Sequence, residues 1–290
     1  MYKSRSERTY QIVIHVLVIL IVISAVFPLL YVLGMSLTGQ VEMMKRNYFV
    51  IIPHEPTFAA YERILVSPLI WKSFGISVFR SAIGTGLMLL LTVVGAYVLS
   101  VRTLPGRNIM LFLVVATILF NAGLIPTYLV VKQLGLINSV WSLVLLYLVD
   151  SFGLLVIKIF IENLPDGLIE AGKIDGASEM QMLVRIVVPL AAPALAAIGL
   201  FSMVFHWNSW FDAMVYLNDA NLFPMQLILK NMLTAASSDA MQALVINGSA
   251  ITPESMKMAT VIVGTLPILM VYPFLQKYFV KGVYMGAVKG

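Results

Sequence analysis

Six long apolar runs limit what this sequence can fold into more than any other feature. They occupy residues 12–35, 74–99, 109–131, 140–160, 191–217 and 258–279. A helix needs about 20 apolar residues to cross the hydrocarbon core of a bilayer. In lipid, only helices and closed barrels satisfy their own backbone polar groups. We therefore predict an all-α, polytopic membrane protein whose residues 1–290 form a single transmembrane domain of six spanning helices.

The composition and the charge distribution agree with this class. Of the 290 residues, 60% are hydrophobic and 11% are charged, with a mean hydropathy of +0.94, whereas soluble domains carry about 25% charged residues. The net charge of +5 is scattered between the apolar runs and forms no stripe, so we do not expect a nucleic-acid partner. With both termini in the cytoplasm, eleven Lys and Arg lie inside and seven outside, as the positive-inside rule favours.

The remaining sequence features refine this topology. The basic N-terminus and the length of the first run favour an uncleaved first helix over a signal peptide. We expect residues 36–72 to be external with short interfacial helices, and the polar residues 218–257 to be external as well. Arg80 lies near the outer end of the second run, where we expect its side chain to snorkel toward water.

Metal and cofactor chemistry is not expected. The sequence contains no cysteine, so thiolate catalysis and cysteine-ligated zinc are excluded. Its three histidines, His15, His54 and His206, are far apart and have no metal-ligand spacing.

The loop at residues 162–190 holds much of the scarce charge. Pro165 suits the first turn of a short helix, and Asp175-Gly176 is typical of the turn that ends one. Ser178 followed by Gln181 has the spacing of a capping box at the start of a second helix. We predict a helix, a tight turn and an amphipathic helix lying flat between two spanning helices, which is a shape suited to docking another protein.

The same loop contains a false nucleotide-binding motif. Residues 167–174 nearly match the phosphate-binding P-loop, but Ile174 stands where a hydroxyl is needed to hold Mg²⁺. Glu170 would also place a carboxylate among the phosphates. We reject nucleotide binding by this chain, so any ATP hydrolysis must come from another subunit.

A polar and aromatic cluster at residues 206–212 marks a candidate substrate cavity in the fifth run. His206, Asn208 and Asp212 are polar groups in an apolar run, and such residues usually face a cavity or a partner helix. Trp207 and Trp210 share a helix face. Flat rings beside amide and carboxylate groups suit a sugar. An interfacial aromatic belt, or packing against a partner subunit, explains the same residues.

A break in the third run adds two residues to this candidate cavity. Asn121, Gly123 and Pro126 interrupt the apolar sequence. Irregular backbone at membrane depth is tolerated only inside protein or beside water. We therefore include Asn121 and Tyr128 among the cavity candidates.

Several of these stretches resemble one protein family. Glu170-Ala171-Gly172, then Gly176 and Pro189 at the right spacing, resemble the EAA loop of ABC importer permeases. Two positions depart from that motif, where Gly172 replaces Ala and Val188 replaces Leu. Residues 120–128, 130–139, 199–213 and the tail 278–290 are similar to the carbohydrate branch, among the lipoprotein- and oligosaccharide-type relatives of the second maltose permease. The resemblance covers essentially the whole chain.

The resemblance implies a larger machine in the cytoplasmic (inner) membrane of a prokaryote. This chain would pair with a second, usually different, permease, above two ATPase subunits, and an extracytoplasmic binding protein would deliver the solute near residues 218–257. The residues implied to dock the ATPase are Glu170, Ala171, Gly172, Asp175, Gly176, Ala177, Ile186 and Pro189. The residues implied to contact it from the tail are Lys281, Gly282, Lys289 and Gly290. The motifs favour a sugar without naming it, and a non-sugar solute remains an alternative.

Two other classes of protein fit less well. An ion-coupled secondary transporter needs acidic residues within the membrane, but only Asp150 and Asp212 lie close to apolar runs, and they are far apart in sequence. An intramembrane enzyme needs a nucleophile–base pair or metal-ligand spacing, and neither is present. We therefore expect a transport subunit and not an enzyme.

Overall fold

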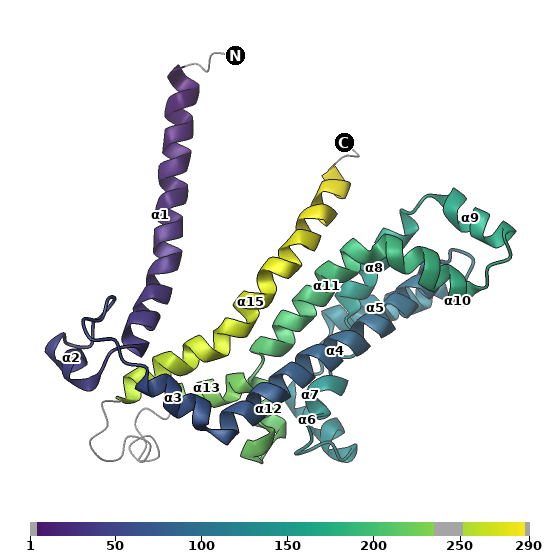
Figure 1. Cartoon of the computed structure of the whole chain (residues 1–290). Coiled ribbons are helices and arrows are strands. Elements are labelled where there is room, and N and C mark those ends of the chain that lie inside the picture. The colour runs from purple at the N-terminus through teal and green to yellow at the C-terminus, as the bar shows by residue number, and fades with distance from the viewer. Residues whose placement is uncertain (1–4, 235–251, 288–290) are drawn as a thin grey trace. The chain divides into compact units, whose positions relative to one another are not determined.

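The structure is a computed structural model that describes residues 5–234 and 252–287, and these are helical, without strands, apart from one isolated bridge between Thr38 and Pro56. The chain divides into two compact units. Unit 1 comprises Met1–Pro68 and Leu229–Leu266, and unit 2 comprises Leu69–Ile228 and Pro267–Gly290. We describe each unit by itself (Figure 1).

Unit 1 contains the first long helix and a small folded segment. Helix α1 (Arg5–Ser36) is followed by α2 (Gln40–Lys45) and α3 (Ala59–Val66). Met35, Met43 and Val50 form a small buried cluster at the end of α1. The apolar stretch Tyr10–Ser36 is long enough to span a bilayer, and none of its most apolar window is buried. An apolar helix with an exposed surface is what lipid solvates well, so the first predicted run is confirmed as a helix able to span.

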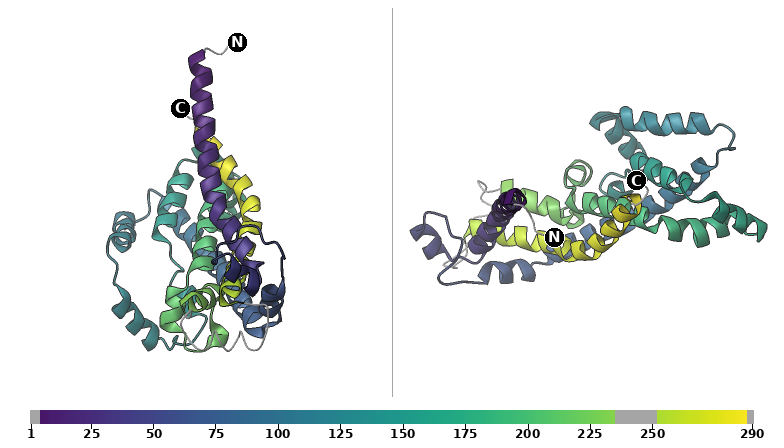
Figure 2. Two further views of the ribbon diagram at one scale, coloured as in Figure 1. Left: turned by 90° about the vertical axis from the view of Figure 1, so that its left-hand side faces the viewer. Right: turned by 90° about the horizontal axis from the view of Figure 1, so that it is seen from above.

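Unit 2 is organised around three helices that run side by side (Figures 1 and 2). They are α4 (Pro68–Ser100), α8 (Ser151–Glu162) and α11 (Val188–Asn208). Pro68 opens α4, where a missing N–H costs nothing. Small residues permit close packing, because a side chain at Gly95 would meet Leu154 and one at Gly199 would meet Leu89. The buried core is Met88, Ala96, Leu99, Leu154, Ile157, Ile161, Leu183, Val187 and Ile198.

The third predicted run is broken more sharply than the sequence indicated. It forms α5 (Arg107–Leu119) and α6 (Leu124–Gln133), which meet at 114°. Gly123 lies at the break with φ +82 and ψ 176, a conformation in which a side chain is strained, and Pro126 follows in the first turn of α6. The fourth run is also interrupted, between α7 (Ser142–Leu145) and α8.

The expected flat amphipathic helix before the fifth run is not a separate element. α10 (Glu179–Met182) continues through a π-helical turn at Leu183–Val187 into α11, so that Glu179–Asn208 is one continuous helix. Pro189 lies at the start of α11, and the helix continues through it. A proline ring clashes with the carbonyl four residues earlier in an α-helix, and the wider π turn relieves that clash. The predicted docking stretch is therefore continuous with the long apolar helix.

The remaining elements extend or revise the predicted boundaries. After α11 the chain forms α12 (Phe211–Tyr216), a short 3₁₀ turn (Ala220–Leu222) and α13 (Met225–Thr234). The start of the segment expected to be a polar external loop is therefore helical, and Leu227 is buried with Leu143 and Ala213. Finally, α15 (Pro253–Ala287) extends past the predicted sixth run. By length and composition, three described helices could span a membrane, or four if α5 and α6 count as one.

Candidate functional site

The predicted docking stretch forms a compact helical pair at one end of unit 2 (Figure 1). α9 (Asp166–Ile174) ends at Gly176, whose φ is +76, and Ser178 then caps α10. The capping box is present in both directions, since the Ser178 hydroxyl accepts from the Gln181 N–H and the Gln181 side chain accepts from the Ser178 N–H. The predicted turn and the predicted cap are thus confirmed.

Gly172, one of the two departures from the expected motif, has a structural reason. A Cβ at Gly172 would lie 2.5 Å from Sδ of Met182 and 3.0 Å from Cδ1 of Ile186. Glycine therefore lets α9 pack closely on the beginning of the long helix. The predicted docking residues Glu170, Ala171, Asp175, Gly176 and Pro189 are exposed, while Ala177 and Ile186 are half-buried.

Polar contacts tie this end of unit 2 to the neighbouring helices. The Tyr97 hydroxyl on α4 donates to Oε2 of Glu179 at the start of α10. Glu162, at the end of α8, accepts from Arg107 at 2.5 Å and from Lys158 at 2.8 Å. Burial pushes the pKa of Glu162 up, but the hydrogen bond and charge of Lys158 and the charge of Arg107 outweigh it, so this pKa lies below its ordinary value.

A buried ionic network lies between α4, α11 and α12. Arg80 is fully buried, and both of its terminal nitrogens donate to the Asp212 carboxylate, one of them across 3.2 Å to Oδ1. Arg80 also donates through Nε to Nδ1 of His206 at 3.3 Å and through Nη1 to the Ser209 carbonyl at 3.1 Å. Our expectation that Arg80 snorkels outward is wrong, because a bidentate carboxylate partner lies within reach inside the fold.

The His206 ring fits against α4 because Gly84 has no side chain. A Cβ at Gly84 would lie 2.6 Å from Nε2 of His206. Since Nδ1 accepts from Arg80, the ring proton is assigned to Nε2. His206 is 1% exposed, and its position is therefore fixed by α4 on one face and by Arg80 at one nitrogen.

The other cavity candidates contact various parts of unit 2. Trp207 packs edge-on against Phe74 with ring centroids 5.9 Å apart. Tyr128 stacks on Tyr216 of α12 at 6.3 Å, and Oδ1 of Asn121 accepts the Gly123 N–H and so closes the break between α5 and α6. Asn208 is exposed and Trp210 is half-buried. Of the seven candidates, His206 and Asp212 are joined through Arg80.

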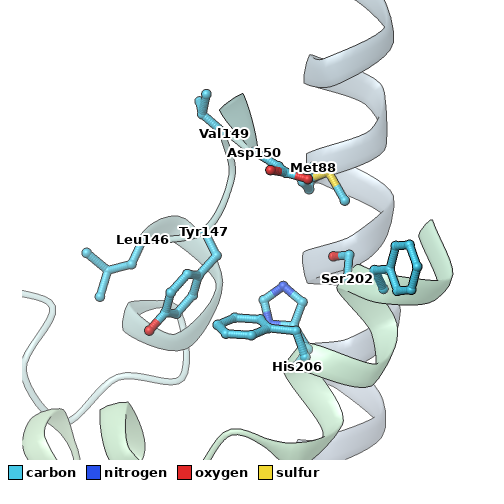
Figure 3. A pocket seen from close by; sticks show the side chains of 9 residues that line it. Met88, Leu146, Tyr147, Val149, Asp150, Ser202 and His206 are labelled. Carbon is cyan, nitrogen blue, oxygen red and sulfur yellow. The ribbon is translucent and has the colours of Figure 1, made fainter. Parts of the chain in front are cut away.

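A cavity of about 310 Å³ opens beside His206 (Figure 3). Tyr147, Asp150 and Ser202 line it together with His206, and they come from the segment between α7 and α8, from the start of α8 and from α11. The sequence singled out His206 and noted Asp150 as a carboxylate beside an apolar run. It gave no indication of Tyr147 or Ser202, because both are ordinary residues of the apolar runs.

Metal-ion binding has no support in the parts of the chain that the structure describes. No group of three or more His, Asp or Glu side chains that could hold a metal ion occurs there. Of the predicted tail residues, Lys281 and Gly282 belong to α15, whereas Lys289 and Gly290 lie outside the described residues.

These features define an all-helical membrane protein with an exposed helix–turn–helix joined directly to a long apolar helix. No family model matches the sequence. The chain is 41% identical to Protein LplC of Bacillus subtilis (strain 168) over 271 residues, covering 91% of this chain and 90% of that protein. It is 38% identical over 285 residues to the polygalacturonan/rhamnogalacturonan transport system permease protein YtcP of the same strain, covering 98% and 99%.

A solved structure agrees with these relatives. It is a crystal structure of a bacterial ABC transporter involved in the import of the acidic polysaccharide alginate. One chain of that structure matches this chain with a TM-score of 0.89 and 31% identity, covering 96% of this chain and 99% of that one. The chain therefore belongs to the permease subunits of ABC importers, in the branch of sugar transport permeases. It is a transport subunit and not an enzyme.

Proposed function

We propose that this chain and a second permease together form the membrane path for a saccharide. A binding protein outside the membrane delivers the saccharide, and two ATPase subunits drive its passage. The named relative that transports polygalacturonan and rhamnogalacturonan, and the solved importer of alginate, support a carbohydrate as the solute. In this assembly the chain spans the inner membrane six times with both termini in the cytoplasm. The spans are α1, α4, the α5–α6 pair, the α7–α8 pair, the α10–α12 segment and α15.

The observation that carries the proposal is the continuous helix from Glu179 to Asn208. One end of this helix holds the exposed α9 turn, where Glu170 is available to a partner. The other end holds His206, which is bound to the buried Arg80. A displacement of α9 by an ATPase is transmitted along a rigid element, because no break separates α10 from α11. Alternating access is then a two-state equilibrium that ATP and the loaded binding protein bias.

The assembled importer, reconstituted in vesicles, tests this function. We expect uptake of labelled oligosaccharide only when ATP, the ATPase subunits and the binding protein are all present. Uptake by the permeases alone would instead identify a secondary transporter, and ATP-driven uptake restricted to non-sugar solutes would remove the carbohydrate assignment.

Charge reversal at Glu170 tests the docking surface. The Glu170→Lys variant is expected to reach the membrane but to lose both ATPase pull-down and uptake, because reversing a charge at a desolvated contact costs several kcal/mol (about 2–5). Glu55→Lys is the matched control, since Glu55 is also exposed but lies in unit 1, far from α9 in sequence. If Glu170→Lys binds the ATPase and transports like the control, α9 is not the docking element.

A further inference from the structure

Asp150 is a carboxylate whose position the mechanism above does not use. It occupies the N-cap of α8, yet its side chain makes no cap hydrogen bond. Within residues 5–234 and 252–287, no hydrogen bond or ion pair engages its carboxylate. The side chain is only partly exposed and lines the 310 Å³ cavity. An ionisable side chain in an apolar helical region is costly unless it serves a ligand or a partner.

The other walls of the cavity complement this carboxylate. Phe201, Phe205 and Tyr147 provide aromatic surface, and the Tyr147 and Phe205 rings lie 4.9 Å apart, edge to face. The Ser202 hydroxyl accepts from Thr85 at 3.3 Å and so keeps its own proton to donate. The volume lies at the lower end of the range for small-ligand pockets, roughly 300–1,000 Å³.

The described residues that line this cavity include no lysine or arginine to balance Asp150. Arg80, the fully buried cation of the adjacent network, directs its terminal nitrogens to Asp212 and Ser209 and not to Asp150. The neighbouring His206 is held neutral at Nδ1 by the Nε–H of Arg80. Within residues 5–234 and 252–287, the carboxylate lies at the start of α8, where the helix dipole favours a negative charge. A ligand that donates hydrogen bonds is therefore complementary, whereas a ligand carrying a second carboxylate meets uncompensated repulsion.

We propose that this cavity is a saccharide subsite that selects neutral sugar rings over carboxylated ones. A ring hydroxyl donates to the Asp150 carboxylate, the Ser202 hydroxyl donates to a sugar oxygen, and the apolar face of the ring packs on Phe205. This inference rests on the proposed function and specifies the class of sugar. Were Asp150 only a helix-capping residue, it would bond to the first turn of α8, which it does not.

The absence of cysteine gives a test that does not require the natural substrate. In the assembled importer, Ser202→Cys is labelled with a cationic and with an anionic methanethiosulfonate reagent, and labelling of this chain is followed with time. Each labelling rate is divided by the rate of the same reagent with a free thiol. After this correction we expect the cationic reagent to react about tenfold faster than the anionic one, and we expect Asp150→Asn to reduce this ratio to about twofold or less. If the ratio of cationic to anionic labelling is the same with Asp150 and in the Asp150→Asn variant, the inference is overturned.

Uptake tests selectivity with chemically matched sugars. The probes are trigalacturonate, its fully methyl-esterified and therefore neutral form, and neutral xylo-, arabino- and maltotriose. We expect neutral trisaccharides to be taken up in preference to trigalacturonate, and Asp150→Asn to shift the ratio toward the acid by about tenfold. Asp150→Glu should keep the original preference, and Glu55→Gln is the control for exchanging an exposed carboxylate.

The outcomes separate this inference from the function on which it rests. If the wild-type importer takes up none of these saccharides while it transports a non-sugar solute, the proposed function fails and the subsite fails with it. If it transports saccharides but Asp150→Asn leaves the acid-to-neutral ratio unchanged in a fully assembled complex, the subsite alone is wrong. Equal uptake of trigalacturonate and its ester by the wild type leads to the same conclusion.

Discussion

Two arginine–carboxylate pairs in unit 2 have the same chemistry in different surroundings. In the α4–α12 pair, the side chains of Arg80 and Asp212 are 0% and 6% exposed. In the α5–α8 pair, the side chains of Arg107 and Glu162 are both 19% exposed. The first pair lies among apolar helices, and the second lies where water reaches both partners. The comparison shows how the energetic role of one type of contact depends on its solvation.

The stability of the buried pair depends on having every hydrogen bond to the two charges in place. Arg80 donates to three different residues, and Oδ1 of Asp212 also accepts the Ala213 N–H at 2.9 Å, so the buried charges are well satisfied. The α5–α8 pair instead has a second cation, because Lys158 binds the other oxygen of Glu162. Removing one member of the first pair therefore leaves a buried charge without its partner. Removing Arg107 from the second pair leaves Glu162 partly solvated and still paired with Lys158.

Helix dipoles sharpen this contrast. Arg107 is the first residue of α5, where the helix dipole disfavours a positive charge. Glu162 is the last residue of α8, where the helix dipole disfavours a negative charge. Their mutual attraction offsets both penalties and holds the two helix ends together. Arg107 also donates from Nε to the Leu99 carbonyl near the end of α4, at 2.8 Å. The α5–α8 pair thus joins three helices and contributes a modest stabilisation.

The largest effect is expected from removing one member of the α4–α12 pair. Arg80→Met should lower the free energy of unfolding by about 3–5 kcal/mol, because it leaves the Asp212 carboxylate buried without its cation. Thermal or denaturant unfolding of the purified complex, together with the yield of folded chain, measures this change.

The double variant Arg80→Met with Asp212→Leu provides the control for that prediction. It removes both charges at once, so most of the stability lost in either single variant should return. If each single variant is as stable as the wild type, the buried pair contributes nothing and the contrast with the α5–α8 pair disappears.

A smaller effect is expected at Gly84, which acts on the buried network without changing any charge. Gly84→Ala should displace the His206 ring and lower stability by about 1–3 kcal/mol, because the added methyl group would overlap Nε2. Gly86→Ala is the matched control two residues along α4. Nothing lies within 4 Å of a Cβ there, so that variant should be neutral or stabilised by up to about 1 kcal/mol. Equal unfolding temperatures for the two variants would contradict the close fit of His206 on α4.

Sequence reasoning succeeded where the determinants are local. The Ser178–Gln181 capping box and the turn at Gly176 were predicted from neighbours a few residues apart, and both are present. The long apolar runs likewise predicted the helices, since hydrophobicity is a property of each segment alone. The roles of Glu170 in docking and of Trp207 and Trp210 at a cavity stay predictions.

Sequence reasoning failed where contacts are distant or where two local signals compete. Arg80 and Asp212 are separated by 132 positions, so nothing beside Arg80 in the sequence revealed its partner. The amphipathic pattern around Ser178–Val187 indicated a separate flat helix, but a π-helical turn joins α10 to α11 and the helix continues. Asp150 belongs to a cavity only because α4, α8 and α11 pack together, which periodicity in one run does not reveal.

The smallest expected effect concerns the α5–α8 pair and carries a pH dependence of definite sign. The pKa of Glu162 is lowered from its ordinary 4.5 in the folded chain, since its cations outweigh the effect of burial. A carboxylate with a depressed pKa contributes stability above its unfolded pKa and loses it as the pH falls through the folded value. At pH 7, Glu162→Gln should therefore cost about 1 kcal/mol, and about half of that or less in high salt, because both partners are partly solvated. As the pH falls below 4.5, the wild type should approach the variant in unfolding temperature, since protonation removes the same charge that glutamine lacks.

Arg107→Met alone should cost less than Glu162→Gln, because Lys158 still binds the carboxylate. A difference between wild type and Glu162→Gln that stays constant from pH 7 to below pH 4 would show that the α5–α8 pair acts through shape and not through charge.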